Sequence, residues 1–251
     1  MRLLVHFHIY YQKQVPYFLR KLRNINGIDW DLWVTGEEAA MPQIKAFKAD
    51  AHFLPVEKVG YDVWPFIALL KAVDLSQYTH VLKLHTKNRS PKIIQLNGVL
   101  MPGYRWRNLL VDALLMSPVH FSKALAAADQ GLACQYVLVK KLSRRAPSDN
   151  ELLRAEAARI GLEIKGEKFA AGTMFISRIE PFAIFKNAPL DAAHFEGESA
   201  THKSGTPAHV YERLISLCVT SAGYQIVPLR TNPVCWAWSK FIRNFVGFIK
   251  G

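Results

Sequence analysis

Two hydrophobic patterns take turns along the first third of the chain. Segments rich in β-branched and aromatic residues predict four strands, at residues 2–11, 29–35, 51–57 and 79–84. Apolar positions at helical spacing predict three helices between them, at residues 14–25, 38–48 and 64–73. Strands that alternate with helices indicate an α/β fold whose sheet is parallel in this part.

The remaining two thirds have a less regular pattern. Helical spacing predicts helices at residues 107–115, 118–129, 149–160 and 208–222. Three more segments have the composition of strands, at residues 135–139, 168–177 and 224–229. Residues 192–207 are rich in Gly, Ser, Thr, His and acidic residues and predict a loop. At 251 residues, with 50% hydrophobic residues, the chain suits a single globular domain over residues 1–233, followed by a tail at 234–251.

Parallel α/β sheets bind ligands at the carboxyl ends of their strands. That rule places residues 8–11, Gly36, residues 60–62 and residues 85–87 on one rim of the sheet. The segment "VLKLHTKN" ends the fourth strand there, and Lys83, His85 and Lys87 share one face if the strand continues. Two interpretations remain open: a site for an anionic diphosphate, or a solvated edge strand with scattered basic residues.

Two short segments contain residues that could either contact a ligand or have a purely structural role. Gly60 permits an unusual turn, and Asp62 precedes an apolar helix as either a helix cap or a ligand group. Gly172 follows two alanines inside the strand at 168–177, where it leaves room for a ligand or for close packing of a helix.

The acidic residues of the last third are candidates for a general base. Glu212 lies off the apolar stripe of its helix and beside Arg213, so a catalytic base and half of an ion pair are both open. Glu196 and Glu198 lie in the predicted loop. His209 and the other histidines there lack the spacing of a metal site.

Charge and composition narrow the class of partner. The formal net charge of +12 indicates an anionic partner. The chain contains no helix-turn-helix, zinc-finger or RNP signature, so nucleic acid is not expected. Three widely spaced cysteines predict reduced thiols in a reducing compartment.

Membrane association is expected to be peripheral at most. The N-terminal segment is not a signal peptide, because His6 and His8 interrupt its apolar run. No apolar run reaches the length of roughly 18 residues that spans a bilayer. The tail interleaves aromatic and basic residues, which suits either an interfacial helix on an anionic membrane or a helix docked on the core. We expect a cytoplasmic protein, peripheral on the inner face of the membrane if it meets one.

Several segments together resemble the rhamnan synthesis protein F family of bacterial cell-surface polysaccharide clusters. They occur in family order across most of the chain: "VHFHIYY", "DLWVTG", "GYDVWPFIALL", "YTHVLKLHTKNRS", "WRNLLVDALLMSP", "FAAGTMFISRIEPF", "FEGES" and "GTPAHVYERL". Two positions depart from the family pattern: Tyr61 replaces an Arg, and Ile176 replaces a Trp. Many relatives carry additional transferase domains.

The resemblance implies a nucleotide-sugar glycosyltransferase with a GT-A-like, Rossmann-like fold: a central, mostly parallel sheet flanked by helices. Such folds usually hold a divalent metal with an Asp-x-Asp pair. Here the matching strand end is "KLHTK", so a metal-independent site is expected, although a divalent metal is not excluded. Donor and diphosphate contacts are expected at His8, Tyr10, Gly60, Asp62, Lys83, His85, Lys87 and Gly172.

The chemistry expected of such an enzyme is an inverting transfer of rhamnose, galactofuranose or a similar sugar to a growing glycan. Glu212 is the first candidate for the catalytic base, with Asp62 next. Contacts with the acceptor, or the base itself, are also expected among Glu196, Glu198, His209 and Arg213. The alternative function is a non-catalytic glycan-binding or scaffolding module of a polysaccharide assembly complex.

Overall fold

The structure, a computed structural model, describes residues 1–87, 93–96, 99–142, 147–196 and 205–231. The strands of this part are β1 (Arg2–Ile9), β2 (Asp29–Gly36), β3 (His52–Phe53), β4 (His80–His85), β5 (Ile93–Leu96), β6 (Val99–Pro102), β7 (Gly131–Gln135), β8 (Val139–Lys141), β9 (Lys168–Ala170), β10 (Phe175–Arg178) and β11 (Gln225–Leu229). The α-helices are α1 (Val15–Leu22), α2 (Met41–Phe47), α3 (Val63–Ala72), α4 (Gly103–Leu115), α5 (Pro118–Ala128), α6 (Pro147–Arg159), α7 (Ala183–Lys186) and α8 (Pro207–Ser221).

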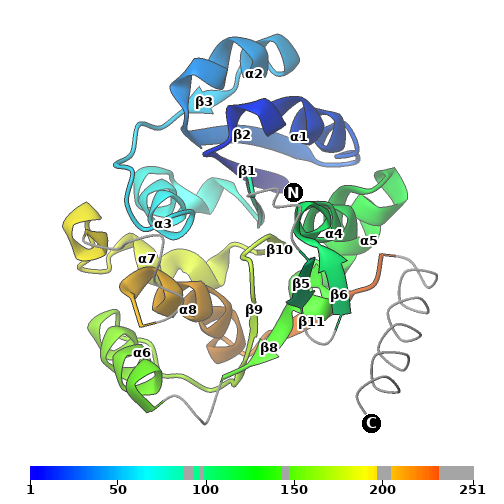
Figure 1. Cartoon of the computed structure of the whole chain (residues 1–251). Coiled ribbons are helices and arrows are strands. Elements are labelled where there is room, and N and C mark those ends of the chain that lie inside the picture. Colours follow the sequence, from blue (N-terminus) through cyan, green and yellow to red (C-terminus); the bar gives the residue numbers. More distant parts are fainter. Residues whose placement is uncertain (88–92, 97–98, 143–146, 197–204, 232–251) are drawn as a thin grey trace, which may run out of the picture.

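A seven-stranded sheet in the order β11-β7-β10-β4-β1-β2-β3 forms the centre of a single α/β domain. The strands are parallel except β10, which runs antiparallel to both β4 and β7. Figure 1 shows α3, α6, α7 and α8 on one side of this sheet and α1, α4 and α5 on the other. Each layer of helices packs on its own apolar cluster. The predicted α/β class with a central, mostly parallel sheet is confirmed.

Burial of both faces explains the composition of the central strands. All six residues of β4 are buried, as are all residues of β1 after Arg2. A strand covered on both faces normally consists of apolar residues. Here β1 carries buried His6 and His8, and β4 carries buried Lys83 and His85, so a polar row runs through an otherwise apolar interior.

Three predicted strands differ from the structure. The strand expected at residues 51–57 is only the two-residue β3, because Pro55 has no N–H with which to continue the ladder. Within residues 135–139, Tyr136–Leu138 form a 3-10 turn that begins where the Gln135 side chain accepts a hydrogen bond from the Val137 N–H. The single strand expected at 168–177 is divided into β9 and β10 by Gly172 and Thr173, whose φ angles are +84° and +47°.

The described region adds elements that the hydrophobic pattern did not predict. Strands β5 and β6 form a separate antiparallel hairpin, and β8 pairs with β9 in a second small sheet. The tail at 234–251 and Glu198 lie outside the described residues. In the described part of the chain, no single helix is long and apolar enough to cross a membrane; α4 and α5 meet that test only as a pair bent by 75°.

Candidate functional site

The order of the strands reverses between β1 and β4. The chain passes from β1 to β2 and β3 on one side and then returns to place β4 on the other side of β1. In open α/β sheets, ligands bind at the carboxyl ends of the strands where this reversal occurs. His8 pairs in register with both Thr35 and His85, and Ile9 pairs with Gly36. The predicted rim is therefore present, and its centre lies between the ends of β1 and β4.

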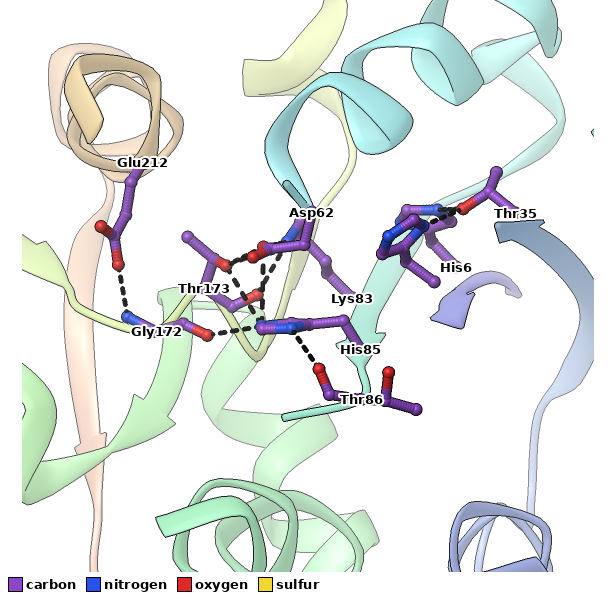
Figure 2. A network of polar contacts seen from close by, with 10 residues as sticks. His6, Thr35, Asp62, Lys83, His85, Thr86, Gly172, Thr173 and Glu212 are labelled. Carbon is purple, nitrogen blue, oxygen red and sulfur yellow. Dashed lines mark hydrogen bonds and ion pairs between the residues drawn. The ribbon is translucent and has the colours of Figure 1, made fainter. Parts of the chain in front are cut away.

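A buried ion pair lies beside this point. The Lys83 Nζ donates to Oδ2 of Asp62 at 2.5 Å and to the Thr173 hydroxyl at 3.0 Å. The Thr173 hydroxyl in turn contacts the same Asp62 oxygen. Lys83 is fully buried, whereas 16% of the Asp62 side chain is exposed. The carboxylate thus neutralises a lysine inside the protein, in the network of contacts that Figure 2 shows, while a small part of it remains exposed to solvent.

Asp62 occupies the N-cap position of α3, but its side chain makes no capping hydrogen bond. The side chain of Asp62 is therefore not a helix cap, and it pairs with Lys83 instead. Tyr61 and Gly60 precede it with φ angles of +52° and +61°. This left-handed turn directs Asp62 toward β4. A Cβ at Gly60 would also lie 3.0 Å from the ring of Phe195, so Gly60 is required for packing as well as for backbone conformation.

The turn between β9 and β10 presents backbone groups to both sides of the cluster. His85 contacts the Gly172 carbonyl oxygen through Nε2 at 2.9 Å, and its Nδ1 lies 3.2 Å from the Thr86 carbonyl oxygen. A neutral ring can donate to only one of these oxygens, and the shorter contact assigns the proton to Nε2. A Cβ at Gly172 would make only an ordinary contact with Leu110, so the positive φ is what requires glycine here.

Glu212 reaches this turn from the opposite direction. Its Oε1 accepts a hydrogen bond from the Gly172 N–H at 2.6 Å. Gly172 therefore contacts Glu212 of α8 through its backbone N–H and His85 of β4 through its backbone carbonyl (Figure 2). The structure brings together Asp62, Lys83, His85, Gly172 and Glu212, all five of which were predicted as site residues.

Burial and charge set the protonation of this cluster. Burial alone would raise the pKa of Asp62, but His85, Lys83 and Lys87 together hold that pKa well below its usual range. Burial lowers the pKa of Lys83, although Asp62 partly offsets this. Burial also holds the pKa of His85 well below 6.5, with Asp62 opposing and Lys87 adding to the effect. Asp62 is therefore ionised and His85 neutral at neutral pH.

A row of histidines extends the cluster across β1. The Thr35 hydroxyl lies 2.9 Å from Nε2 of His6 and 2.9 Å from Nδ1 of His8. Burial lowers the pKa of His8 to about 4 and that of His6 well below its usual value. Both rings are therefore neutral near pH 7. His8, of which 8% is exposed, lies at the rim, while His6 is completely enclosed.

Side chains around the end of β4 fix its position. The Thr86 hydroxyl accepts hydrogen bonds from the backbone N–H groups of Tyr10 and Tyr11, at 2.9 and 3.0 Å. Gln14 donates to the Lys87 carbonyl oxygen at 2.5 Å. Strand β4 ends at His85, and the half-buried Lys87 lies with its Nζ 4.7 Å from the centre of the Trp106 ring. Tyr10 is exposed.

Three other predicted residues are described by the structure: His209 and Arg213 belong to α8, and Glu196 precedes that helix. His209 contacts the Thr206 hydroxyl through Nδ1 at 2.8 Å, and its ring lies 6.1 Å from that of Tyr61. Arg213 lies over the Phe169 ring. Glu196 is exposed after the 3-10 turn Ala192–Phe195.

The donor set of the cluster does not suit a divalent cation. Magnesium and calcium prefer several oxygen ligands, whereas β4 contributes a lysine and a histidine, and Asp62 already neutralises Lys83. No group of three or more His, Cys, Asp or Glu side chains is arranged to hold a metal in the part of the chain that the structure describes.

Sequence reasoning did not identify the hydroxyl groups that organise the site. Thr173, Thr35 and Thr86 each bridge two segments that are distant in the sequence. The only local signal for Thr173 was its position directly after Gly172. Its left-handed backbone follows from the turn, and nothing in the residue type predicts it.

Comparisons with known proteins agree with the motifs. Two curated relatives, both called Uncharacterized protein WxcX, come from Xanthomonas campestris pv. campestris strains B100 and ATCC 33913. Each is 28% identical over 176 residues, which cover 68% of this chain and 24% of the relative. The chain therefore spans only part of the length of these relatives. The family model for Rhamnan synthesis protein F matches residues 1–224. Because this match covers most of the chain, the protein belongs to the rhamnan synthesis protein F family and is associated with polysaccharide synthesis.

Proposed function

We propose that the protein is a glycosyltransferase with a GT-A-like fold, which transfers a sugar from a nucleotide-sugar donor to a growing cell-surface polysaccharide. The sugar is rhamnose, galactofuranose or a similar residue, and the acceptor is a glycan or a lipid-linked glycan. The observation that carries the proposal is the cluster of Asp62, His85, Gly172 and Glu212 beside the point where the strand order reverses. The family membership supports the substrate class.

Lys87 is the cation best placed to meet the diphosphate. Lys83 is fully buried and paired with Asp62, so its charge is used within the protein. Lys87 is half-buried beyond the end of β4 and lies over Trp106. In this proposal the Lys87 ammonium stabilises the negative charge that develops on the departing diphosphate. His8, whose Nδ1 contacts Thr35, offers its other ring nitrogen at the rim, while His85 uses its proton to hold the Gly172 carbonyl.

Asp62 suits the recognition of hydroxyl groups better than proton abstraction. A base is most effective when its pKa lies near the working pH, whereas the pKa of Asp62 is held well below its usual range. The exposed part of this fixed carboxylate accepts hydrogen bonds from the ribose or the donor sugar.

Glu212 is the proposed base. Its Oε1 is fixed by the Gly172 N–H, and the side chain is only half-buried. In an inverting transfer, the acceptor oxygen forms a bond to the anomeric carbon and gives its proton to Glu212. The bond from that carbon to the diphosphate oxygen breaks, and the nucleoside diphosphate leaves with the electron pair.

We further propose that the transfer proceeds without a metal, at the cytoplasmic face of the membrane. The donor set of the cluster supports the first point, because cationic and neutral donors occupy the end of β4. Activity that disappears with EDTA and returns with a divalent cation would overturn this part.

A thermal-shift screen against nucleoside diphosphates and their sugars tests the central proposal. A ligand at about 100 times its Kd stabilises the folded state by about 2.7 kcal/mol. For a domain of this size, each kcal/mol of stabilisation raises the Tm by about 2–4 °C. We expect one nucleotide to raise the Tm in wild type and to do so less in Lys87→Ala. Binding of saccharides without binding of any nucleotide would instead identify a non-catalytic glycan-binding module.

A further inference from the structure

The last turn of α1 and the elbow between α4 and α5 form a surface that combines exposed basic and apolar side chains. Asn24, which follows the C-cap residue of α1, donates to the Leu115 carbonyl oxygen at the end of α4, at 2.8 Å. This contact places the end of α1 against the elbow, and Figure 1 shows the three helices on the same side of the sheet. The exposed residues of this elbow patch are Arg20, Arg23, Met116, Pro118, Val119 and Lys123.

Apolar side chains are unusually exposed at the elbow. Val119 is 60% exposed and Met116 is 37% exposed. Met116 is the C-cap residue of α4 and Val119 is the second residue of α5, so both lie where the chain bends by 75° between the two helices. Val119 and Lys123 are four residues apart on α5 and therefore lie on the same face of that helix.

The charge around these apolar residues is positive. No acidic residue occurs between Lys13 and Arg23. Asp112 is the one carboxylate in the sequences of α4 and α5, and it pairs with Lys21 at 2.6 Å. Arg20 and Arg23 are exposed one turn apart. The surface thus offers cations around a small apolar tip.

We infer that the elbow patch docks the protein on an anionic lipid surface. Basic side chains near a membrane are attracted to acidic headgroups, while exposed apolar side chains enter the interface between headgroup and acyl chain. A nucleic acid would use the cations but would gain little from Met116 and Val119, so the observations favour a lipid surface.

The position of the patch has a consequence for orientation. Helix α1 follows the carboxyl end of β1, beside the candidate site, and the chain then returns to the start of β2. The last turn of α1 therefore lies toward the amino ends of the parallel strands, away from the candidate site. A protein docked through the elbow patch keeps the candidate site away from the lipid and accessible to the free end of a glycan. The docking itself is independent of the proposed transferase activity.

Co-sedimentation of the full chain with vesicles tests the inference. Vesicles of phosphatidylcholine alone are compared with vesicles that also contain phosphatidylglycerol. We expect binding to the anionic vesicles and a loss of affinity of about 10- to 30-fold in Arg20→Gln/Arg23→Gln. Met116→Ser/Val119→Ser, which leaves the charge unchanged, is expected to bind more weakly than wild type.

Lys165→Gln/Lys168→Gln is the matched control. It removes the same charge from two exposed lysines on the side of α6 and α8, and we expect its binding to resemble that of wild type. The inference is overturned if Arg20→Gln/Arg23→Gln binds as wild type does, if the control loses as much affinity, or if the chain binds oligonucleotides but no anionic vesicle. Circular dichroism melting confirms that each variant is folded.

Discussion

Lys83 and Asp62 lie 21 positions apart in the sequence, yet the lysine Nζ is 2.5 Å from the carboxylate oxygen at the interface between β4 and the start of α3. Thr173, from a third segment, contacts both partners. Lys83, one of the three residues predicted to meet a diphosphate, is thus neutralised within the protein. Its partner Asp62 is fixed at the rim of the sheet, so the pair serves both the stability of the fold and the geometry of the site.

Breaking this pair is expected to destabilise the fold. Lys83→Met leaves the Asp62 carboxylate without its buried counter-charge, which costs about 3–5 kcal/mol of unfolding free energy. Urea denaturation measures the change. Lys58→Met is the control, because Lys58 forms an exposed ion pair with Glu37, and such pairs contribute little. If Lys83→Met lowers the unfolding free energy no more than this control does, the buried pair is not important for stability.

The buried histidines predict a loss of stability in mild acid. The pKa of His8 falls from 6.5 to about 4 on folding, so the unfolded chain binds more protons than the native protein between these values. The contribution of neutral His8 is therefore complete above about pH 6.5 and is lost as the pH falls toward about 4. Urea midpoints across this range measure the effect. In His8→Asn, the amide can replace Nδ1 as the partner of Thr35, and the urea midpoint should depend less steeply on pH. An unchanged slope would show that other groups cause the loss of stability in acid.

Lys87 is expected to contribute to nucleotide affinity and little to folding. Lys87→Ala removes the half-buried cation beyond β4, and the loss of one charged hydrogen bond should weaken binding of a nucleoside diphosphate by roughly tenfold or more. Isothermal titration calorimetry gives the affinity. Lys13→Ala removes a nearby exposed cation and should bind as wild type does. Equal affinities for Lys87→Ala and wild type would place the diphosphate elsewhere.

Glu212→Gln separates catalysis from structure. The glutamine oxygen still accepts a hydrogen bond from the Gly172 N–H, so Tm and nucleotide affinity should be preserved. Loss of the base should lower the rate of sugar transfer by roughly 100- to 10,000-fold, measured as release of nucleoside diphosphate in the presence of acceptor. Glu163→Gln, at an exposed position outside the candidate site, serves as the control. Near-normal turnover in Glu212→Gln would limit Glu212 to holding the β9–β10 turn.

The sequence alone determined the elements whose pattern is local. Strands β1, β2 and β4 and most helices follow from hydrophobic spacing, because a residue buried on a strand or helix recurs with the period of that element. The rim was predicted for the same reason, since strand ends in a parallel sheet meet at one edge. The family motifs also indicated Asp62, His85, Gly172 and Glu212, which the fold brings together.

Only the tertiary structure decided how these residues are used. Whether Lys83 meets a ligand or a buried carboxylate depends on the approach of α3 to β4, which no local pattern encodes. The reversal at Gly172 and Thr173 interrupts an apolar segment that is continuous by composition, because its hydrogen bonds go to Glu212 and His85 rather than to a neighbouring strand. The partners of these backbone groups are distant in the sequence, and they come within hydrogen-bond distance only once the sheet and both helical layers have assembled.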